Sequence, residues 1–155
     1  MGSGSQKVVH RATMDGVDVA VMTPRNSSCS LKTDLTAMTK AMGAKHVLQL
    51  IGGDESMLVS ELATMGSVVD LADTLEFAGK RLTPSDTDVI MSHVSVGVDE
   101  LRQQGLCHGD LHPRNVLVFS YDPLVAKLGD LGECCEGDTQ SDELRMLERE
   151  LHALM

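Results

Sequence analysis

The sequence has 155 residues, of which 42% are hydrophobic and 23% charged, and its formal net charge is −10. This length allows one domain with a modest core, and the apolar fraction excludes a disordered chain. The acidic balance argues against a nucleic-acid-binding protein, which needs a basic face. There is no apolar run of transmembrane length and no signal peptide pattern, so we expect a cytoplasmic protein with no membrane partner.

The composition also limits how the core and the cysteines are used. Aromatic residues make up only 2% of the chain and ten residues are Met, so Met side chains must fill part of the core. The four cysteines include one adjacent pair and no C-x-x-C motif, which is a poor spacing for a metal site. Without a signal peptide we expect free thiols rather than a disulfide framework. These cysteines are Cys29, Cys107, Cys134 and Cys135.

The first sixty residues predict strands and one helix. Two strands are expected on either side of the Asp15-Gly16 turn, because β-branched residues recur on both sides of it. Apolar residues at helical spacing predict a helix over residues 31–42. Two short strands are expected at 47–51 and 57–59, with a turn at 52–54 between them.

The remaining residues are mostly helical by pattern. A short helix is expected at 68–75 and a long one at 85–104, which Pro84 precedes and Gly105 follows. Two β-branched runs predict a hairpin around residues 120–123. The tail predicts an acidic amphipathic helix over 138–154. A strand-rich half followed by a helix-rich half indicates an α+β chain.

The strongest chemical signal is the segment His108-Gly-Asp-Leu-His-Pro-Arg-Asn115, which lies between the long helix and the hairpin. Asp130-Leu-Gly132 follows at the far end of that hairpin. Phosphoryl transfer needs a carboxylate to meet the incoming hydroxyl and oxygen ligands to hold Mg²⁺ on the phosphates, all on a rigid scaffold. Asp110, Asn115 and Asp130 are residues of these types at a spacing that a hairpin can bring together.

These motifs resemble the catalytic loop and the magnesium-binding motif of the protein kinase superfamily, and the resemblance covers nearly the whole chain. It implies that Asp110 is the catalytic base and that Asn115 and Asp130 bind Mg²⁺. Gly109 stands where the family usually has Arg, as in kinases of the aminoglycoside phosphotransferase type. That Arg normally pairs with a phosphorylated activation loop, so no such control is expected. His112 stands where many kinases have Lys, and the resemblance implies contact with a substrate phosphate.

A second segment, residues 58–71, resembles the strand, hinge and helix that bind adenine in kinases. By this resemblance Ser60 is a small gatekeeper, and the backbones of Glu61 and Ala63 hydrogen-bond the adenine edge. Asp70 is expected to cap the following helix or to approach the ribose. The resemblance places these further residues in the ATP site: Gly2, Gly4, Val9, Ala20, Met22 and Leu117.

The expected phosphate-binding lysine is displaced in this sequence. Residues 19–22 resemble the kinase strand V-A-x-K with Met22 in place of Lys, and Met carries neither charge nor donor. Residues 2–9 have the form G-x-G-x-x-K-x-V, in which Lys7 replaces the third Gly of the glycine-rich loop. This arrangement resembles the with-no-lysine kinases, so Lys7 is one hypothesis for the catalytic cation. The other is an inactivated pseudokinase. Asp34 is the only candidate for the helical acid, and with Met22 opposite we expect it to be a helix N-terminal charge.

The C-terminal part lacks an Ala-Pro-Glu motif and a long activation segment. Asp142 resembles the acid that braces the catalytic loop from below. We therefore expect a two-lobed protein-kinase-like fold, with a small lobe over 1–62 and a reduced helical lobe over 63–155. The expected activity is transfer of the γ-phosphoryl group of ATP, with Mg²⁺, to a protein or small-molecule hydroxyl. The alternatives are a silent nucleotide-binding scaffold and a lobe completed by a second copy or a partner protein.

Overall fold

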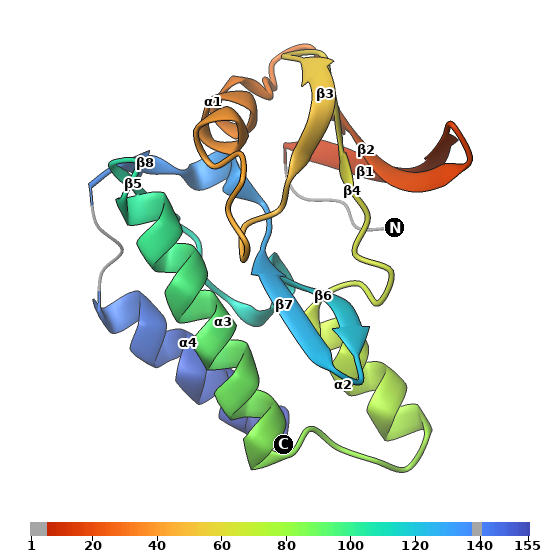
Figure 1. Ribbon diagram of the computed structural model, residues 1–155, viewed down its shortest axis with the longest axis vertical. Coiled ribbons are helices and arrows are strands. Elements are labelled where there is room, and N and C mark those ends of the chain that lie inside the picture. Colours follow the sequence, from red (N-terminus) through yellow and green to blue (C-terminus); the bar gives the residue numbers. More distant parts are fainter. Residues whose placement is uncertain (1–5, 138–140) are drawn as a thin grey trace.

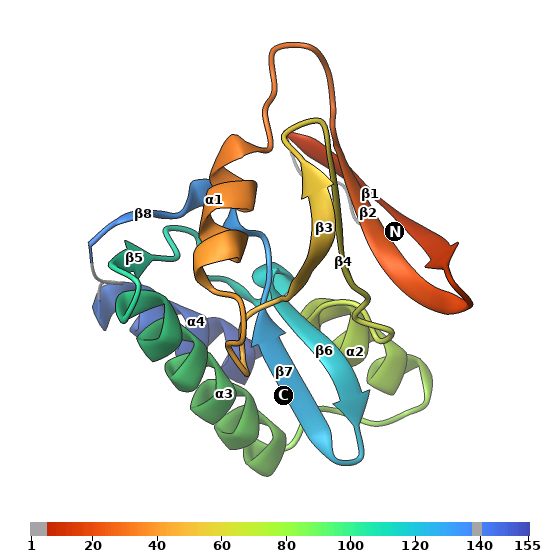
Figure 2. The same cartoon turned by 45° about the horizontal axis from the view of Figure 1, so that its top comes forward.

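The computed structural model describes residues 6–137 and 141–155. A four-stranded sheet with helix α1 makes up one half of the molecule, and three helices with a β-hairpin make up the other (Figures 1 and 2). The α+β prediction is therefore confirmed. The strands are β1 (Lys7–Met14), β2 (Val17–Pro24), β3 (Leu50–Asp54), β4 (Met57–Glu61), β5 (Leu106–Cys107), β6 (Val116–Tyr121), β7 (Leu124–Leu128) and β8 (Cys135–Glu136). The helices are α1 (Lys32–Lys40), α2 (Val68–Phe77), α3 (Pro84–Arg102) and α4 (Ser141–Ala153), with 3-10 turns η1 (Pro113–Asn115) and η2 (Leu131–Glu133).

The four-stranded sheet is antiparallel and has the order β1-β2-β4-β3. Asp15 and Gly16 make the predicted β1–β2 turn, and both have positive φ, as a type I′ hairpin turn requires. The register sets Val9 beside Met22. It also sets Ala20 beside Ser60. These pairings fix which side chains of β1, β2 and β4 reach the same face of the sheet.

The strand predicted at 47–51 begins later than expected. β3 covers Leu50–Asp54, so the predicted turn at 52–54 is wrong and lies within the strand. The β3–β4 pairing shifts register between Leu50 and Gly52, so that Ile51 has no partner while both glycines stay paired with β4. Gly53 has φ +118°, and a Cβ on it would lie 2.1 Å from the Met57 carbonyl oxygen, so only Gly fits. The real turn follows Asp54, whose side chain accepts a hydrogen bond from the Ser56 N–H at 2.8 Å.

The helices begin at well-formed caps. Ser67 with Asp70, and Thr83 with Asp86, form capping boxes at the start of α2 and α3. The apolar faces of these helices enter one core, which α4 closes through Leu147 and Leu151. Residues 138–140 of the predicted C-terminal helix lie outside the described residues. Among the described residues, no helix has the length and apolar character needed to cross a membrane.

The segment before β3 joins the two halves of the molecule. Leu48 N–H donates to the Leu128 carbonyl, and Leu128 N–H donates to the His46 carbonyl, both at 2.8 Å. The His46 ring is also hydrogen-bonded through Nδ1 to the Ala126 carbonyl at 2.8 Å. The Glu100 carboxylate of α3 accepts from His46 N–H at 2.8 Å. These bonds hold β7 in place, and β7 leads directly to the Asp130 turn.

The expectation that all four cysteines are free thiols is wrong. Cys107 and Cys135 form a disulfide, while Cys29 and Cys134 are free. The two bonded residues face each other because β8 returns antiparallel to β5. Both strands are only two residues long, so no periodic pattern in the sequence indicates them.

The close packing of α3 against the β7 side of the molecule generates the first prediction. Gly97 lies in α3, and a Cβ there would lie 2.5 Å from the His46 carbonyl oxygen and 3.0 Å from Leu128. An exposed Gly→Ala change in a helix stabilises it by up to about 1 kcal/mol. Gly97→Ala should instead lower the free energy of unfolding by about 1–3 kcal/mol, because the core there has no room.

Urea denaturation measures this effect, with Ser95→Ala on the exposed face of the same helix as the matched control. We expect Ser95→Ala to change the free energy of unfolding by less than about 0.5 kcal/mol. A Gly97→Ala protein as stable as the unaltered chain would contradict the packing described for α3.

Candidate active site

A cleft of about 520 Å³ lies between the sheet and the β6–β7 hairpin. Its walls come from β1, β2, α1, the segment after β4, the Asp130 turn, and the loop of residues 108–115, which is called the catalytic loop below because of its resemblance to that loop of kinases. Gly2 and Gly4 of the predicted site lie outside the described residues. All the other predicted site residues line this cleft: Lys7, Val9, Ala20, Met22, Ser60, Glu61, Ala63, Asp110, Asn115, Leu117 and Asp130.

The catalytic loop is organised around the buried ring of His108. Asp110 N–H donates to His108 Nδ1 at 3.2 Å, so the other ring nitrogen carries the proton. That nitrogen, Nε2, donates to the Gly129 carbonyl at 2.7 Å. Burial lowers the pKa of His108 by more than the hydrogen bond to Gly129 and the nearby carboxylates raise it, which favours the neutral ring. One uncharged side chain therefore ties the backbone of Asp110 to the residue before Asp130.

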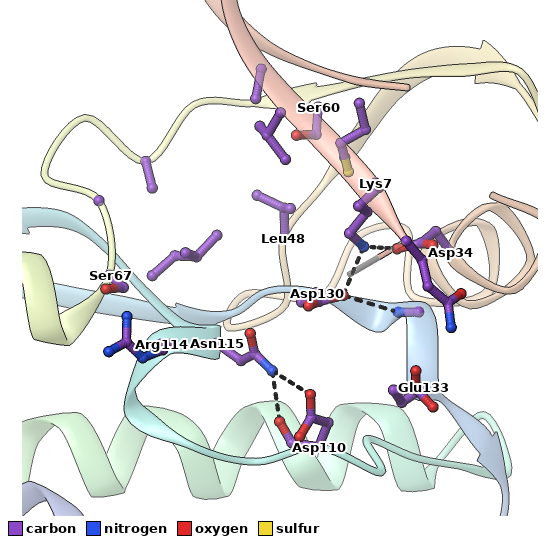
Figure 3. A pocket seen from close by; sticks show the side chains of 18 of the residues that line it. Lys7, Asp34, Leu48, Ser60, Ser67, Asp110, Arg114, Asn115, Asp130 and Glu133 are labelled. Carbon is purple, nitrogen blue, oxygen red and sulfur yellow. Dashed lines mark hydrogen bonds and ion pairs between the residues drawn. The ribbon is translucent and has the colours of Figure 1, made fainter. Parts of the chain in front are cut away.

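The amide of Asn115 fixes the carboxylate of Asp110. Asn115 Nδ2 donates to the Asp110 carbonyl at 2.8 Å and to Asp110 Oδ2 at 3.0 Å. The nitrogen thus points down to Asp110, and the amide oxygen points up into the cleft (Figure 3). His112 lies beside this pair, with Nε2 at 3.5 Å from Asp110 Oδ2. The loop therefore presents one amide oxygen and one carboxylate to the cleft.

Gly109, at the position where a kinase usually has Arg, is required by packing. It has φ +83°, and a Cβ would lie 2.3 Å from the Glu133 carbonyl oxygen. No larger residue fits without displacing the backbone. The catalytic loop therefore packs directly on the turn that follows Asp130.

The Lys7 ammonium lies inside the cleft and joins three elements. Lys7 starts β1 and is 7% exposed. Its Nζ pairs with Asp34 of α1 and, at 2.7 Å, with Oδ1 of Asp130, which caps η2 (Figure 3). Asp130 itself has φ +50° and accepts from Gly132 N–H at 3.4 Å. One cation thus holds the first strand, the first helix and the Asp130 turn together.

Charge pairing shifts the pKa values of Lys7 and Asp130 in the direction opposite to burial, and by more than burial does. Burial alone would lower the pKa of Lys7, but Asp130 and Asp34 raise it further, so the pKa lies above its usual value. Burial alone would raise the pKa of Asp130, but the Lys7 ammonium and its hydrogen bond hold that pKa below its usual range. Both groups therefore stay charged at neutral pH.

The structure agrees with the sequence interpretation at Met22 and adds an unexpected contact at Asp34. Met22 is buried on β2 and lines the cleft without charge, as its side chain dictates. Asp34 lies in the first turn of α1, as expected for a helix N-terminal charge, but it also has a partner that the sequence did not indicate, because Lys7 reaches it from strand β1. Only the helical-acid position in the family pattern pointed to Asp34. Nothing in the local sequence indicates a pair that is 27 residues apart.

The hinge segment presents backbone groups to the cleft. Ser60 is fully buried, and its hydroxyl donates to the Glu61 carbonyl at 3.0 Å. The Ala63 carbonyl accepts from Gly66 N–H at 3.1 Å. Within the described part of the chain, Ala63 N–H has no hydrogen-bond partner and is free to donate to a ligand. The Glu61 side chain faces Lys127 of β7, with which it forms an ion pair at 2.7 Å.

Two acidic residues singled out in the sequence have different outcomes. Asp70 caps α2, as expected, and its carboxylate accepts from Ser67 N–H at 2.7 Å. Asp142 lies exposed on α4, 3.9 Å from Arg145 of the same helix, so the expectation that it braces the catalytic loop is wrong. Glu143, one residue later, makes the smallest of the three carboxylate contributions that raise the pKa of the buried His108 ring, after those of Asp130 and Asp110.

The donor set fits a magnesium ion that is shared with phosphates. The described residues contain no group of three or more His, Cys, Asp or Glu side chains able to hold a metal alone. Mg²⁺ is usually bound by one or two carboxylates together with substrate phosphates. The Asn115 amide oxygen and the Asp130 carboxylate are suitable ligands of this kind, because both lie on the cleft wall.

Comparison with known proteins identifies the family. The family model described as protein tyrosine and serine/threonine kinase matches residues 1–152. The chain belongs to this kinase family. Membership in the protein kinase superfamily and the kinase-like character of the fold are therefore confirmed.

Individual relatives are similar over shorter segments. The chain is 35% identical over 118 residues, 68% of its length, to an Ack-related non-receptor tyrosine kinase of Caenorhabditis elegans, of which it covers 10%. It is 35% identical over 92 residues, 57% of its length, to the serine/threonine-protein kinase hal4 of Schizosaccharomyces pombe, of which it covers 14%. It is 23% identical over 139 residues, 85% of its length, to the kinase pakG of Dictyostelium discoideum, of which it covers 11%. The chain thus spans about a tenth of the length of these relatives.

The buried Lys7 contacts generate the second prediction. Lys7→Met leaves Asp34 and Asp130 without their cation, so the free energy of unfolding should fall by about 3–5 kcal/mol. Arg11 is the matched control, because it lies on β1 like Lys7 but pairs at the surface with the exposed Asp18 of β2. Arg11→Met should cost less than about 1 kcal/mol.

Chemical denaturation of both variants measures the difference. Adding Asp34→Asn to Lys7→Met should recover part of the loss, because it removes one of the two unpaired carboxylates. Equal losses for Lys7→Met and Arg11→Met would contradict a buried ion pair at this position.

Proposed function

We propose that this chain is an ATP- and Mg²⁺-dependent phosphotransferase that transfers the γ-phosphoryl group to a hydroxyl acceptor. One observation carries the proposal: a buried cation, Lys7, meets Asp34 and Asp130 in the same cleft that holds Asp110 and Asn115. Phosphoryl transfer depends on positioned charges more than on covalent chemistry. A cleft with one fixed cation, a carboxylate base and two oxygen ligands suits that chemistry.

In this proposal Asp110 accepts the proton of the acceptor hydroxyl. Its Oδ2 is held by Asn115, which leaves Oδ1 to face the acceptor. The acceptor oxygen forms a bond to the γ-phosphorus while the bond from that phosphorus to the β-phosphate oxygen breaks, and ADP leaves. Asn115 and Asp130 would hold Mg²⁺, which when bound neutralises charge on the phosphate oxygens.

Lys7 supplies the cation that Met22 lacks. Its ammonium lies beside Asp130, so it is within the same part of the cleft as the proposed metal ligands. We assign to it the α- and β-phosphates of the nucleotide, as in the with-no-lysine arrangement. Met22 then packs as an apolar wall of the site.

The adenine ring is proposed to bind along the hinge. The Glu61 carbonyl is a candidate acceptor and the Ala63 N–H a candidate donor for its edge. The apolar side chains of Val9, Ala20 and Leu117 line the same cleft and would cover the ring.

The alternative function is a silent nucleotide-binding module. Met22 favours it, because the strand that normally delivers the lysine delivers no charge. Both functions include nucleotide binding. They differ in that only the phosphotransferase forms ADP together with a phosphorylated acceptor.

The third prediction concerns nucleotide binding. Mg²⁺ and ATP at about a hundredfold above the dissociation constant should stabilise the fold by about 2.7 kcal/mol. Asp130→Asn should weaken this stabilisation, because it removes charge from a proposed metal ligand. Asp110→Asn should keep most of the binding and abolish transfer, because Asp110 faces the acceptor.

Thermal denaturation with and without Mg²⁺ and ATP measures binding, and ADP formation measures transfer. Asp18→Asn on the sheet surface is the matched control and should leave the ligand-induced stabilisation unchanged. A lack of stabilisation in the unaltered chain would overturn the proposal. Stabilisation without ADP formation from ATP, whichever hydroxyl acceptor is present, would favour the silent module.

A further inference from the structure

The disulfide between Cys107 and Cys135 encloses the proposed catalytic residues. Cys107 immediately precedes His108, and Cys135 comes shortly after the Asp130 turn. The covalent ring closed by this bond therefore contains Asp110, Asn115 and Asp130. No other described part of the chain is closed in this way.

Few non-covalent contacts hold the segment after Asp130 against the catalytic loop. The β5–β8 ladder has only two residue pairs. Gly137 N–H donates to the Gly105 carbonyl at 3.1 Å. Gly109 packs closely on the Glu133 backbone. The disulfide is thus the strongest single link between the two segments that carry Asp110 and Asp130.

The two cysteines of the disulfide differ in exposure. Residue Cys135 is exposed, whereas Cys107 is buried. A thiol in solution can therefore reach the Cys135 side of the bond. The neighbouring Cys134 does not compete with an external thiol for the disulfide. Burial, and then the carboxylates of Asp34 and Asp130, raise its pKa to about 12 and keep it in the unreactive thiol form.

We propose that the Cys107–Cys135 disulfide is a reversible redox bridge that sets the affinity of the cleft for Mg²⁺ and ATP. When the bridge is intact, the far end of the Asp130 turn is tied covalently to the strand that leads into the catalytic loop. When it is reduced, Lys7 and the hydrogen bonds of Gly129 still hold the start of this turn, but only the two-residue ladder and its few neighbouring contacts hold its far end. This inference rests on the proposed function for its nucleotide readout.

The chemistry is thiol–disulfide exchange with a dithiol reductant. A thiolate of the reductant attacks Cys135 Sγ, the S–S bond breaks, and the Cys107 sulfur leaves with the electron pair and takes up a proton. The second thiol of the reductant then attacks the mixed disulfide and releases the Cys135 thiol. The protein gains two electrons and two protons, and the reductant becomes a disulfide. The reverse exchange with a disulfide oxidant restores the bridge.

The fourth prediction compares the oxidised and the reduced chain. Thiol titration should find two free thiols before reduction with dithiothreitol and four after it. Reduction should weaken the binding of Mg²⁺ and ATP about tenfold, because the Asp130 carboxylate is then supported from only one end of its turn. Amide hydrogen exchange should become faster in residues 131–137. Calorimetry and exchange measured by mass spectrometry give the two readouts.

Single-cysteine variants provide the controls. Cys135→Ser, at the exposed position, should behave like the reduced chain in both readouts and no longer respond to dithiothreitol. Cys107→Ser should do the same. Cys29→Ser, which removes a free thiol elsewhere, should respond as the unaltered chain does.

The outcomes separate this inference from the proposed function. Equal exchange in residues 131–137 before and after reduction overturns the redox bridge, as does unchanged affinity in a chain that binds nucleotide. A chain that binds no nucleotide in either state contradicts the proposed function. In that case faster exchange after reduction still supports the structural part of the inference.

Discussion

The pairing of one buried ammonium, that of Lys7, with Asp34 and Asp130 is the interaction on which the cleft depends. A buried cation needs close carboxylates to offset its desolvation, and a buried carboxylate needs a cation for the same reason. Because the three groups come from β1, α1 and the Asp130 turn, their pairing requires these elements to pack together. The pKa of Lys7 is raised and that of Asp130 lowered, so each stabilises the charge of the other.

On the catalytic-loop side of the cleft, the main contacts are hydrogen bonds made by uncharged side chains. The neutral His108 ring links the Asp110 backbone to Gly129, and the Asn115 amide holds the Asp110 carboxylate. These are fixed hydrogen bonds, so the catalytic loop is ordered before any ligand binds. Preorganised polar groups of this kind are what phosphoryl transfer requires from a protein. The Cys107–Cys135 bridge adds a covalent constraint to the same loop.

Much of the fold could be read from local sequence. The helices follow from apolar spacing and from boundary residues such as Pro84 and Gly105, and the β1–β2 turn follows from Asp15-Gly16. The candidate site residues Asp110, Asn115 and Asp130 followed from motif spacing, and all three line one cleft. What could not be read was long-range: the Lys7–Asp34 pair and the β5–β8 ladder with its disulfide depend on how distant elements pack. Short strands and single ion pairs leave no periodic trace in a sequence.

The central claim is that Lys7 of β1 supplies the phosphate-binding cation. Moving the lysine from β1 to β2 tests this claim most directly. The measurement is the dissociation constant for Mg²⁺ and ATP of the unaltered chain, Lys7→Met, Met22→Lys and the double variant, each verified as folded. We expect Lys7→Met to weaken binding by about 10- to 100-fold, the loss of one charged hydrogen bond. The double variant should recover most of it, because β2 then delivers the cation. Lys7→Met binding as tightly as the unaltered chain, with Met22→Lys alone binding more tightly, would contradict the claim.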